Sequence, residues 1–260
     1  MRVHDIVNVV ASAFPPELAE SWDRPGLSVG DPDAQVTGVA CALDVTPAAI
    51  RAARDAGCNV LVTHHPAFLD PPFPVTPEVR TSSLAGACDW EAVRLGVALV
   101  AAHTNLDRSE AALDLASELL GLERTGRLQE PKGYGALLEA DGLTLGQLAS
   151  RAGAAFGCTP TVWGDPARAL EAAAFCSGSL GSFGQDAVRR GVGCVITGEA
   201  GYHWLSELAC AGVDAILLGH DASERPYAGL LARTLRDAAP DTGIQVLDEP
   251  LRWRAWPEGE

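Results

Sequence analysis

Long apolar runs that end in polar residues predict buried parallel strands. The runs cover residues 36–43, 59–63, 98–102 and 215–218. Apolar runs without polar alternation are typical of strands that are covered on both faces of a parallel sheet. A last strand is expected at residues 244–247.

Helical patterns separate these strands, and one strand–helix–strand layout occurs twice. Thr46 and Pro47 supply an N-cap and a first-turn proline for a helix over residues 48–56, which Gly57 ends. The second copy has, in order, a strand at 172–176, a glycine-rich turn at 177–184, a helix at 185–190 and a strand at 194–197. Further helices are expected over 109–120 and about 223–238.

The repeat predicts an α/β fold made of two related α/β lobes. Their sheets are expected to be mixed but largely parallel, with a metal site in the cleft between the lobes. Pro131 and Gly133 mark the expected boundary. Lobe 1 then covers residues 1–125, with 240–260 returning to it, and lobe 2 covers 126–239, in one compact unit without an inserted third domain.

Candidate metal ligands stand where the apolar runs end. His64 and His65 follow one run, and Pro66 stops the strand there, so that both imidazoles can open into a crevice. Two histidines that diverge from one strand end suit two neighbouring ions better than one. A buried or surface structural role is the alternative for a histidine pair taken alone.

Three other residues extend this candidate set. His220 and Glu224 share one helical face if a helix begins near residue 222, and Asp107 adds a loop carboxylate. Taken singly, a capped helix start, an exposed glutamate and an Asx-turn explain these residues equally well. Together with the histidine pair they give three imidazoles and two carboxylates, which suit Zn, Mn, Fe, Co or Ni better than Ca or Mg.

Composition narrows the classes of function. Lys and Arg number 19 against 34 Asp and Glu, for a formal net charge of -15, which disfavours nucleic-acid binding. A regulatory nucleic-acid-binding ring would need Arg24, Arg51, Arg54 and Arg80 to cluster. The opening residues are too short and charged for a signal peptide, and no apolar stretch approaches the ~20 residues of a membrane span, so we expect a cytoplasmic protein.

The cysteines do not indicate a zinc ribbon. All seven lack a C-x-x-C partner. Cys41, Cys176 and Cys194 lie inside apolar segments, where reduced thiols act as small hydrophobic side chains.

Short motifs in a fixed order give the chain a specific resemblance. They are SWDRPGLSVGD at 21–31, ALDVT at 42–46, THHP at 63–66, AHTNLD at 102–107, GSLGSF at 178–183, ITGE at 196–199 with Tyr202 and His203, and GH at 219–220 through Glu224. On these motifs, nearly the entire chain resembles the Nif-three-like family, whose members carry the name GTP cyclohydrolase 1 type 2 homologue.

The resemblance implies a dinuclear metal site. Its ligands would be His64, His65, Asp107, His220 and Glu224, which hold two divalent transition-metal ions, with one carboxylate bridging them. It also implies self-association into a toroidal homohexamer. The identity of the metal stays open between Zn, Fe, Mn, Co and Ni.

Other motif residues are candidates for contact with a substrate. Glu199 is the best acid outside the ligand set for general-base work. His103 and His203 look like pocket groups, with a hydrogen-bonded structural role as the alternative. The turn at 177–184 either cradles an anion at a helix N-terminus or is a plain tight turn, since its glycines fit no nucleotide fingerprint.

Three departures from the family pattern bear on substrate selection. Arg24 stands where Asn is more frequent, Asp221 where an aromatic residue is usual, and Trp204 where an acidic residue is typical. None is a presumed ligand, and each is able to line the crevice.

The leading hypothesis is a metal-dependent hydrolase in which two ions hold and acidify a water molecule. Its specific form is attack at C8 of GTP with release of formate, so that a nucleotide is the expected small-molecule substrate. The alternative is a non-catalytic metal-binding or metal-delivery protein, or a ring-shaped scaffold that uses the ions for assembly.

Overall fold

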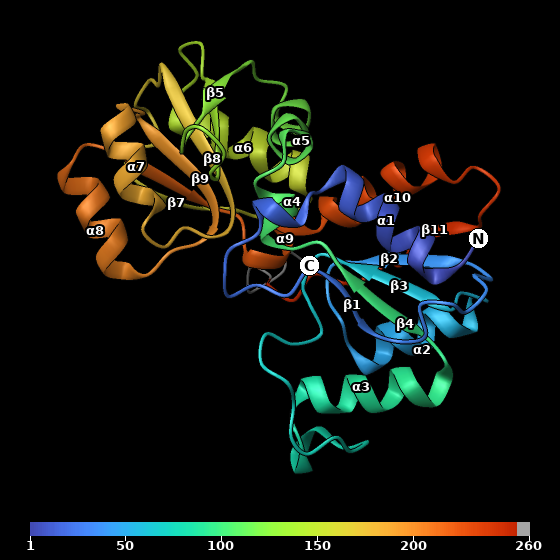
Figure 1. Ribbon diagram of the computed structural model, residues 1–260. Coiled ribbons are helices and arrows are strands. Elements are labelled where there is room, and N and C mark those ends of the chain that lie inside the picture. The colour runs from blue at the N-terminus through green and yellow to red at the C-terminus, as the bar shows by residue number, and fades with distance from the viewer. Residues whose placement is uncertain (254–260) are drawn as a thin grey trace, which may run out of the picture. The chain divides into compact units, whose positions relative to one another are not determined.

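The computed structural model describes residues 1–253 and divides into two compact units. Unit 1 comprises Met1–Leu106 and Tyr227–Glu249, and unit 2 comprises Asp107–Pro226 and residues 250–253. Each unit is a sheet covered by helices (Figure 1).

Unit 1 is built on a sheet with the strand order β1-β4-β3-β2-β11. Its strands are β1 (Gly26–Val29), β2 (Val39–Ala42), β3 (Val60–Thr63), β4 (Ala98–Ala101) and β11 (Ile244–Val246). Its helical elements are α1 (Val3–Ala13), η1 (Pro16–Leu18), α2 (Pro47–Asp55), η2 (Val79–Thr81), α3 (Leu84–Leu95), the residues of α4 (Thr104–Asp107) up to Leu106, and α10 (Pro226–Ala238) from Tyr227 on. Only β1 runs antiparallel to its neighbour among the strands that the structure describes in this unit.

Helices cover both faces of the unit 1 sheet, which explains the continuous apolar strands. In Figure 1, α2 and α3 lie below the sheet and α1 and α10 lie above it. Every residue of β2, β3 and β4 is buried as a result. The side chain of Thr46 accepts a hydrogen bond from the Ala49 amide and so caps α2, as predicted.

Unit 2 contains a sheet with the order β5-β6-β8-β9-β10-β7. Its strands are β5 (Arg124–Arg127), β6 (Ala136–Glu139), β7 (Thr161–Trp163), β8 (Ala172–Ser179), β9 (Cys194–Glu199) and β10 (Asp214–Leu217). Its helices are α5 (Glu110–Leu120), α6 (Leu145–Phe156), α7 (Phe183–Arg190), α8 (Tyr202–Cys210) and α9 (His220–Glu224).

Two apolar layers enclose the unit 2 sheet. Residues of α5 and α6 pack on one face, and residues of α7 and α8 pack on the other. Cys176 and Cys194 are buried in these layers, and burial raises the pKa of the Cys176 thiol to about 12. The expectation that these cysteines act as small hydrophobic side chains agrees with their burial.

The expected α/β class is confirmed, and both units carry the predicted strand–helix–strand layout. These copies are β2-α2-β3 and β8-α7-β9, each with parallel strands. The unit 2 sheet is less parallel than expected, because β5, β6 and β7 all pair antiparallel. These strands are only partly buried and lack the continuous apolar run of the parallel strands.

The boundaries between the units differ from the expected 1–125 and 126–239. Residues 107–125 belong to unit 2 because α5 packs on α6, β5 and β6, and residues 227–239 belong to unit 1. Of the 240–260 segment, residues 240–249 join unit 1 and 250–253 join unit 2, while 254–260 lie outside the described residues.

Two local expectations need correction. Asp107 ends the short helix α4 instead of lying on a loop. The helix expected over 223–238 is two helices, α9 and α10, because Pro226 cannot donate the hydrogen bond that would continue α9.

A search of residues 1–253 for membrane spans finds no helix with the length and hydropathy that a span requires.

Candidate metal centre

The end of β3 places two adjacent histidines at the carboxyl edge of the unit 1 sheet. The amides of His64 and His65 still donate to the carbonyls of Ala42 and Leu43 next to them, at 3.3 and 3.0 Å. The strand itself ends at Thr63, as Pro66 predicted. The His64 side chain is fully buried, whereas that of His65 is partly exposed.

His103, which follows β4, joins this pair to form a cluster of three imidazoles. The ring centroids of His64 and His103 are 5.3 Å apart, those of His65 and His103 are 5.7 Å apart, and those of His64 and His65 are 5.1 Å apart. One ring nitrogen from each histidine lies within 4.8 Å of the other two. The parallel pairing of β3 and β4 aligns the two strand ends and so brings the rings together.

An oxygen atom binds the Nδ1 atom of each of these histidines. The His64 Nδ1 lies 3.0 Å from the Ala102 carbonyl, the His65 Nδ1 lies 2.7 Å from Asp44, and the His103 Nδ1 lies 2.9 Å from Asp23. Carbonyl and carboxylate oxygens accept, so each Nδ1 donates, and Nε2 is then the atom suited to a metal. Such outer partners fix the tautomer and orientation of metal-binding histidines.

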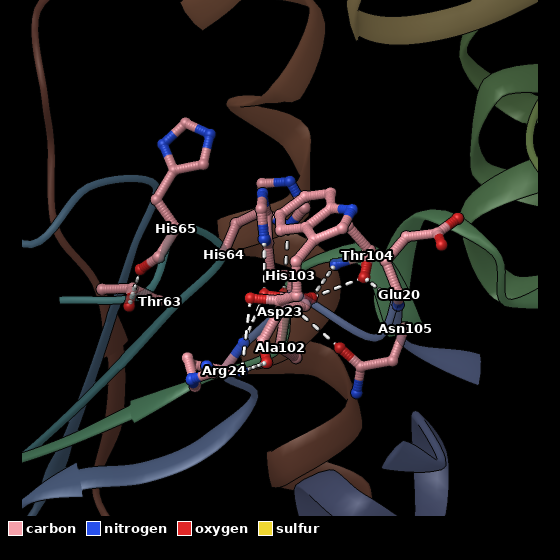
Figure 2. Close-up of polar contacts among 11 residues, drawn as sticks. Glu20, Asp23, Arg24, Thr63, His64, His65, Ala102, His103, Thr104 and Asn105 are labelled. Carbon is pink, nitrogen blue, oxygen red and sulfur yellow. Dashed lines mark hydrogen bonds and ion pairs between the residues drawn. The ribbon is translucent and has the colours of Figure 1, made fainter. Parts of the chain in front are cut away.

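Asp23 organises the polar contacts around His103 (Figure 2). Its buried carboxylate accepts hydrogen bonds from the Thr104 amide at 3.0 Å, the Thr104 hydroxyl at 2.5 Å and the Arg24 amide at 2.7 Å. Burial raises the pKa of Asp23, but the hydrogen bonds from His103 and Thr104 outweigh it and hold that pKa well below its usual range. Asp23 is therefore a fixed anion at the base of the histidine cluster.

In unit 2, the end of β10 positions a second group of candidate ligands. His220 begins α9 and Glu224 ends it, and the His220 Nε2 lies 3.1 Å from a Glu224 carboxylate oxygen. Their shared helical face is confirmed, although the helix begins at His220 and not near residue 222. The His220 Nδ1 donates to Glu199, at the end of β9, over 2.9 Å.

Two glycines leave the space that this group occupies. A Cβ atom on Gly178 would lie 2.2 Å from a Glu224 carboxylate oxygen, and one on Gly198 would lie 2.9 Å from the His220 Cα. The Ser223 hydroxyl binds both sides of this close packing, because it accepts from the Gly178 amide and donates to the His220 carbonyl. Gly178 in the bulged strand β8 and Gly198 in β9 thus permit this close approach.

Asp107 lies beside the end of β8 in the same unit. The Ser177 hydroxyl donates to an Asp107 carboxylate oxygen at 3.2 Å. Unit 2 by itself therefore holds both carboxylate and imidazole donors. Nitrogen and carboxylate donors of this kind fit a divalent transition metal.

The remaining candidates lie in other surroundings. Glu199, expected as a general base, has one carboxylate oxygen engaged by His220, which gives it a positioning contact. His203 is an exposed residue of α8 with a ring contact to Tyr202. Trp204 lines a groove with Val188 and Arg189 on α7.

Sequence reasoning passed over Asp23 and Asp44 as individual residues. Both lie inside the motifs at 21–31 and 42–46, but only their contacts with His103 and His65 give them a role. A carboxylate far away in sequence is recognisable as a histidine partner only after folding brings the two together.

This α/β protein has strand-end histidines whose Nδ1 atoms are held by oxygen atoms, and it has carboxylates beside some of them. It therefore belongs to the class of candidate transition-metal-binding proteins. The model of the family Duf34/NIF3 (NGG1p interacting factor 3) matches residues 1–250, so the chain belongs to this family. The resemblance stated from the motifs is confirmed.

Similar proteins cover nearly the full chain. A GTP cyclohydrolase 1 type 2 homolog of Clostridium acetobutylicum is 29% identical over 255 residues, 95% of this chain and 94% of the relative. One of Streptomyces coelicolor is 30% identical over 255 residues, 93% and 88% of the two chains. The Staphylococcus aureus hypothetical protein SA1388 has a crystal structure that superposes with a TM-score of 0.86 at 21% identity, over 97% of this chain and 99% of that one.

Proposed function

We propose that this protein is a hydrolase that uses two divalent transition-metal ions to open the imidazole ring of GTP and release formate. The names of its relatives support the substrate and the reaction. The observation that carries the metal site is the engagement of Nδ1 in His64, His65 and His220 by oxygen atoms. These contacts orient each imidazole through atoms of its own unit.

We propose that the ions would be held by His64, His65, Asp107, His220 and Glu224. Divalent ions so held would polarise water and stabilise the oxyanion that develops during attack. Zn, Fe, Mn, Co and Ni all suit this mixture of nitrogen and oxygen donors.

The chain's own residues have two tasks in this proposal. We propose that His103, whose Nδ1 donates to Asp23, exchanges a proton at Nε2 with water or substrate. Glu199 orients His220 through its Nδ1, and we propose that its other carboxylate oxygen binds the substrate. The first water adds to C8 with cleavage of the C8–N9 bond, and the second cleaves C8–N7 and releases formate.

A formate assay tests this function. Protein reconstituted separately with Zn²⁺, Mn²⁺, Fe²⁺, Co²⁺ or Ni²⁺ is incubated with GTP, and formate is quantified with the metal content of each sample. We expect formate from the wild type, a loss of at least 100-fold in His65→Ala, and no change in His4→Ala, an exposed residue of α1. No formate from any wild-type sample, or equal formate from His65→Ala, would contradict the proposal.

We further propose that the protein assembles into a ring-shaped homohexamer. Exposed apolar side chains on α3 and the segment before it support self-association, namely Phe73, Val79, Trp90 and Val93. Light scattering after size exclusion should give six times the chain mass. We expect Val93→Asp to lower that mass and Val188→Asp, on α7, to leave it unchanged, whereas a monomeric wild type would overturn the proposal.

A further inference from the structure

Unit 2 contains a cavity of about 420 Å³ beside Glu199. Its apolar walls come from Pro160, Leu217, Leu218 and Trp253, and hydroxyl groups come from Thr159, Thr161 and Ser179. A cavity with apolar walls and a few polar groups is the usual form of a small-molecule site. The volume is sufficient for a flat two-ring heterocycle.

Asp221 places Trp253 at this cavity. One Asp221 carboxylate oxygen accepts from the backbone amide of Arg252 and, at 3.4 Å, from that of Trp253. The other oxygen accepts from the Ala222 amide at 2.9 Å and so fixes the carboxylate at the start of α9. The residue that departs from the family pattern after Gly219-His220 thus anchors residues 252 and 253.

Gly219 provides the room for this arrangement. A Cβ atom at Gly219 would lie 3.0 Å from the Trp253 Cβ, and the φ angle of +94° is one that other residues rarely adopt. The Trp253 side chain remains 56% exposed, so much of its ring surface is accessible to a ligand. An indole held by its backbone at a cavity edge is a suitable surface for stacking.

Glu199 supplies the polar edge of the same cavity. Its Oε1 accepts from His220, and no hydrogen bond to residues 1–253 engages its Oε2. A carboxylate oxygen accepts and cannot donate, so it selects N–H or O–H groups on a ligand edge and repels an anionic group. Guanine presents two such donors side by side, its ring N–H and its exocyclic amine.

We infer that this cavity binds a planar heterocycle with N–H donors on one edge, of the guanine type. Trp253 stacks on its face, Glu199 accepts from its edge, and Asp221 acts as the positioning residue that holds Trp253. This inference rests on the proposed function, because it assigns the place where the base of the substrate lies.

Guanosine binding to chelator-treated protein tests the inference without any turnover. Isothermal titration with guanosine should show one site per chain, while ribose 5-phosphate should not bind. Trp253→Ala should weaken guanosine about 5- to 150-fold, the range of a lost base–aromatic stack, and Trp253→Phe should retain most of the affinity. Val188→Ala removes an exposed apolar side chain from α7, outside this cavity, and should have no effect.

Asp221 is tested by a pair of variants. Asp221→Ala should weaken guanosine as much as Trp253→Ala does, whereas Asp221→Asn, which keeps one oxygen to accept from the amides of residues 252 and 253, should weaken it less. A role in stability alone would change the melting temperature in Asp221→Ala and leave the dissociation constant unchanged.

The outcomes separate this inference from the proposed function. Absence of guanosine binding, or equal binding by wild type and Trp253→Ala, overturns the cavity assignment even if the metal-loaded protein releases formate. Guanosine binding that depends on Trp253 supports it even if no formate is formed.

Discussion

At the scale of single residues, Asp23 determines how His103 is held. Its side chain is completely buried and accepts four hydrogen bonds from His103, Thr104 and Arg24. Since the carboxylate is ionised and fully engaged, removal of its charge would leave several buried donors poorly matched. The histidine cluster therefore depends on a residue that we do not place among the metal ligands.

Asp23→Asn should destabilise the protein by about 1–3 kcal/mol, because an amide cannot accept at both positions. It should also lower metal affinity about 10- to 100-fold if His103 or its neighbours bind the ion. Urea unfolding of metal-free protein and a competitive metal titration give the two values. Asp70→Asn, an exposed carboxylate of unit 1, is the control, and unchanged values in both assays would contradict the role of Asp23.

Gly178 is the second decisive residue, and it allows a matched comparison. Gly178 and Gly181 both have positive φ angles, of +59° and +48°, but only Gly178 has Glu224 within reach of an added Cβ. Gly181→Ala should cost about 1 kcal/mol from backbone strain alone. Gly178→Ala should cost clearly more and also weaken metal binding, as thermal unfolding and metal titration would show. Equal effects of the two substitutions would mean that Glu224 can move aside without consequence.

At the scale of elements, helices α2 and α3 are joined by one buried carboxylate. Glu91 of α3 accepts from Arg51 of α2 at 3.0 Å and from Arg94 at 2.8 and 2.9 Å. The hydrogen bonds from Arg94 and Arg51 lower the pKa of Glu91 to about 2 against the opposing effect of burial.

The lowered pKa of Glu91 gives a pH dependence with a defined sign. A carboxyl whose pKa is lower in the folded state adds stability above its unfolded value of 4.5, and this stability is lost as pH falls through about 2. Glu91→Gln should therefore cost about 1 kcal/mol at pH 7, because both arginines are half exposed, and the difference from wild type should vanish between pH 5 and 2. Urea unfolding across this range measures it, with the exposed Glu17→Gln as control, and a difference that stays constant would refute it.

Elements also show how far prediction from sequence extends. The strands β2, β3, β4, β8, β9 and β10 are mostly buried apolar segments, and their pattern predicts them because burial on both faces requires it. The antiparallel strands β5, β6 and β7 carry no such pattern, since they are only partly buried and their form depends on pairing with a neighbouring strand. Pro226 marks the break between α9 and α10 in the sequence, but the helical spacing of apolar residues on both sides of it favours one continuous helix.

At the scale of the whole molecule, metal binding should be coupled to folding. An ion that binds only the folded protein stabilises it by about 2.7 kcal/mol at a concentration of 100 times its dissociation constant. Addition of Zn²⁺ or Mn²⁺ to chelator-treated protein should therefore raise the melting temperature of the wild type. We expect little rise in His220→Ala and a normal rise in His4→Ala; an equal rise in all three would place the ion elsewhere.

The sequence by itself determined the α/β class, the family and the candidate ligands His64, His65, Asp107, His220 and Glu224. It could do so because buried parallel strands need continuous apolar residues and because polar residues at their ends are local features of the chain. The order of short motifs then identified the family.

Only the tertiary structure decided which groups hold the histidines at the strand ends. The pairing of Asp23 with His103, Asp44 with His65 and Glu199 with His220 joins residues 80, 21 and 21 positions apart. The same holds for the boundaries between the units and for the contact of Asp221 with residue 253. Such contacts depend on the three-dimensional path of the chain, and local periodicity contains no record of which distant side chains that path brings together.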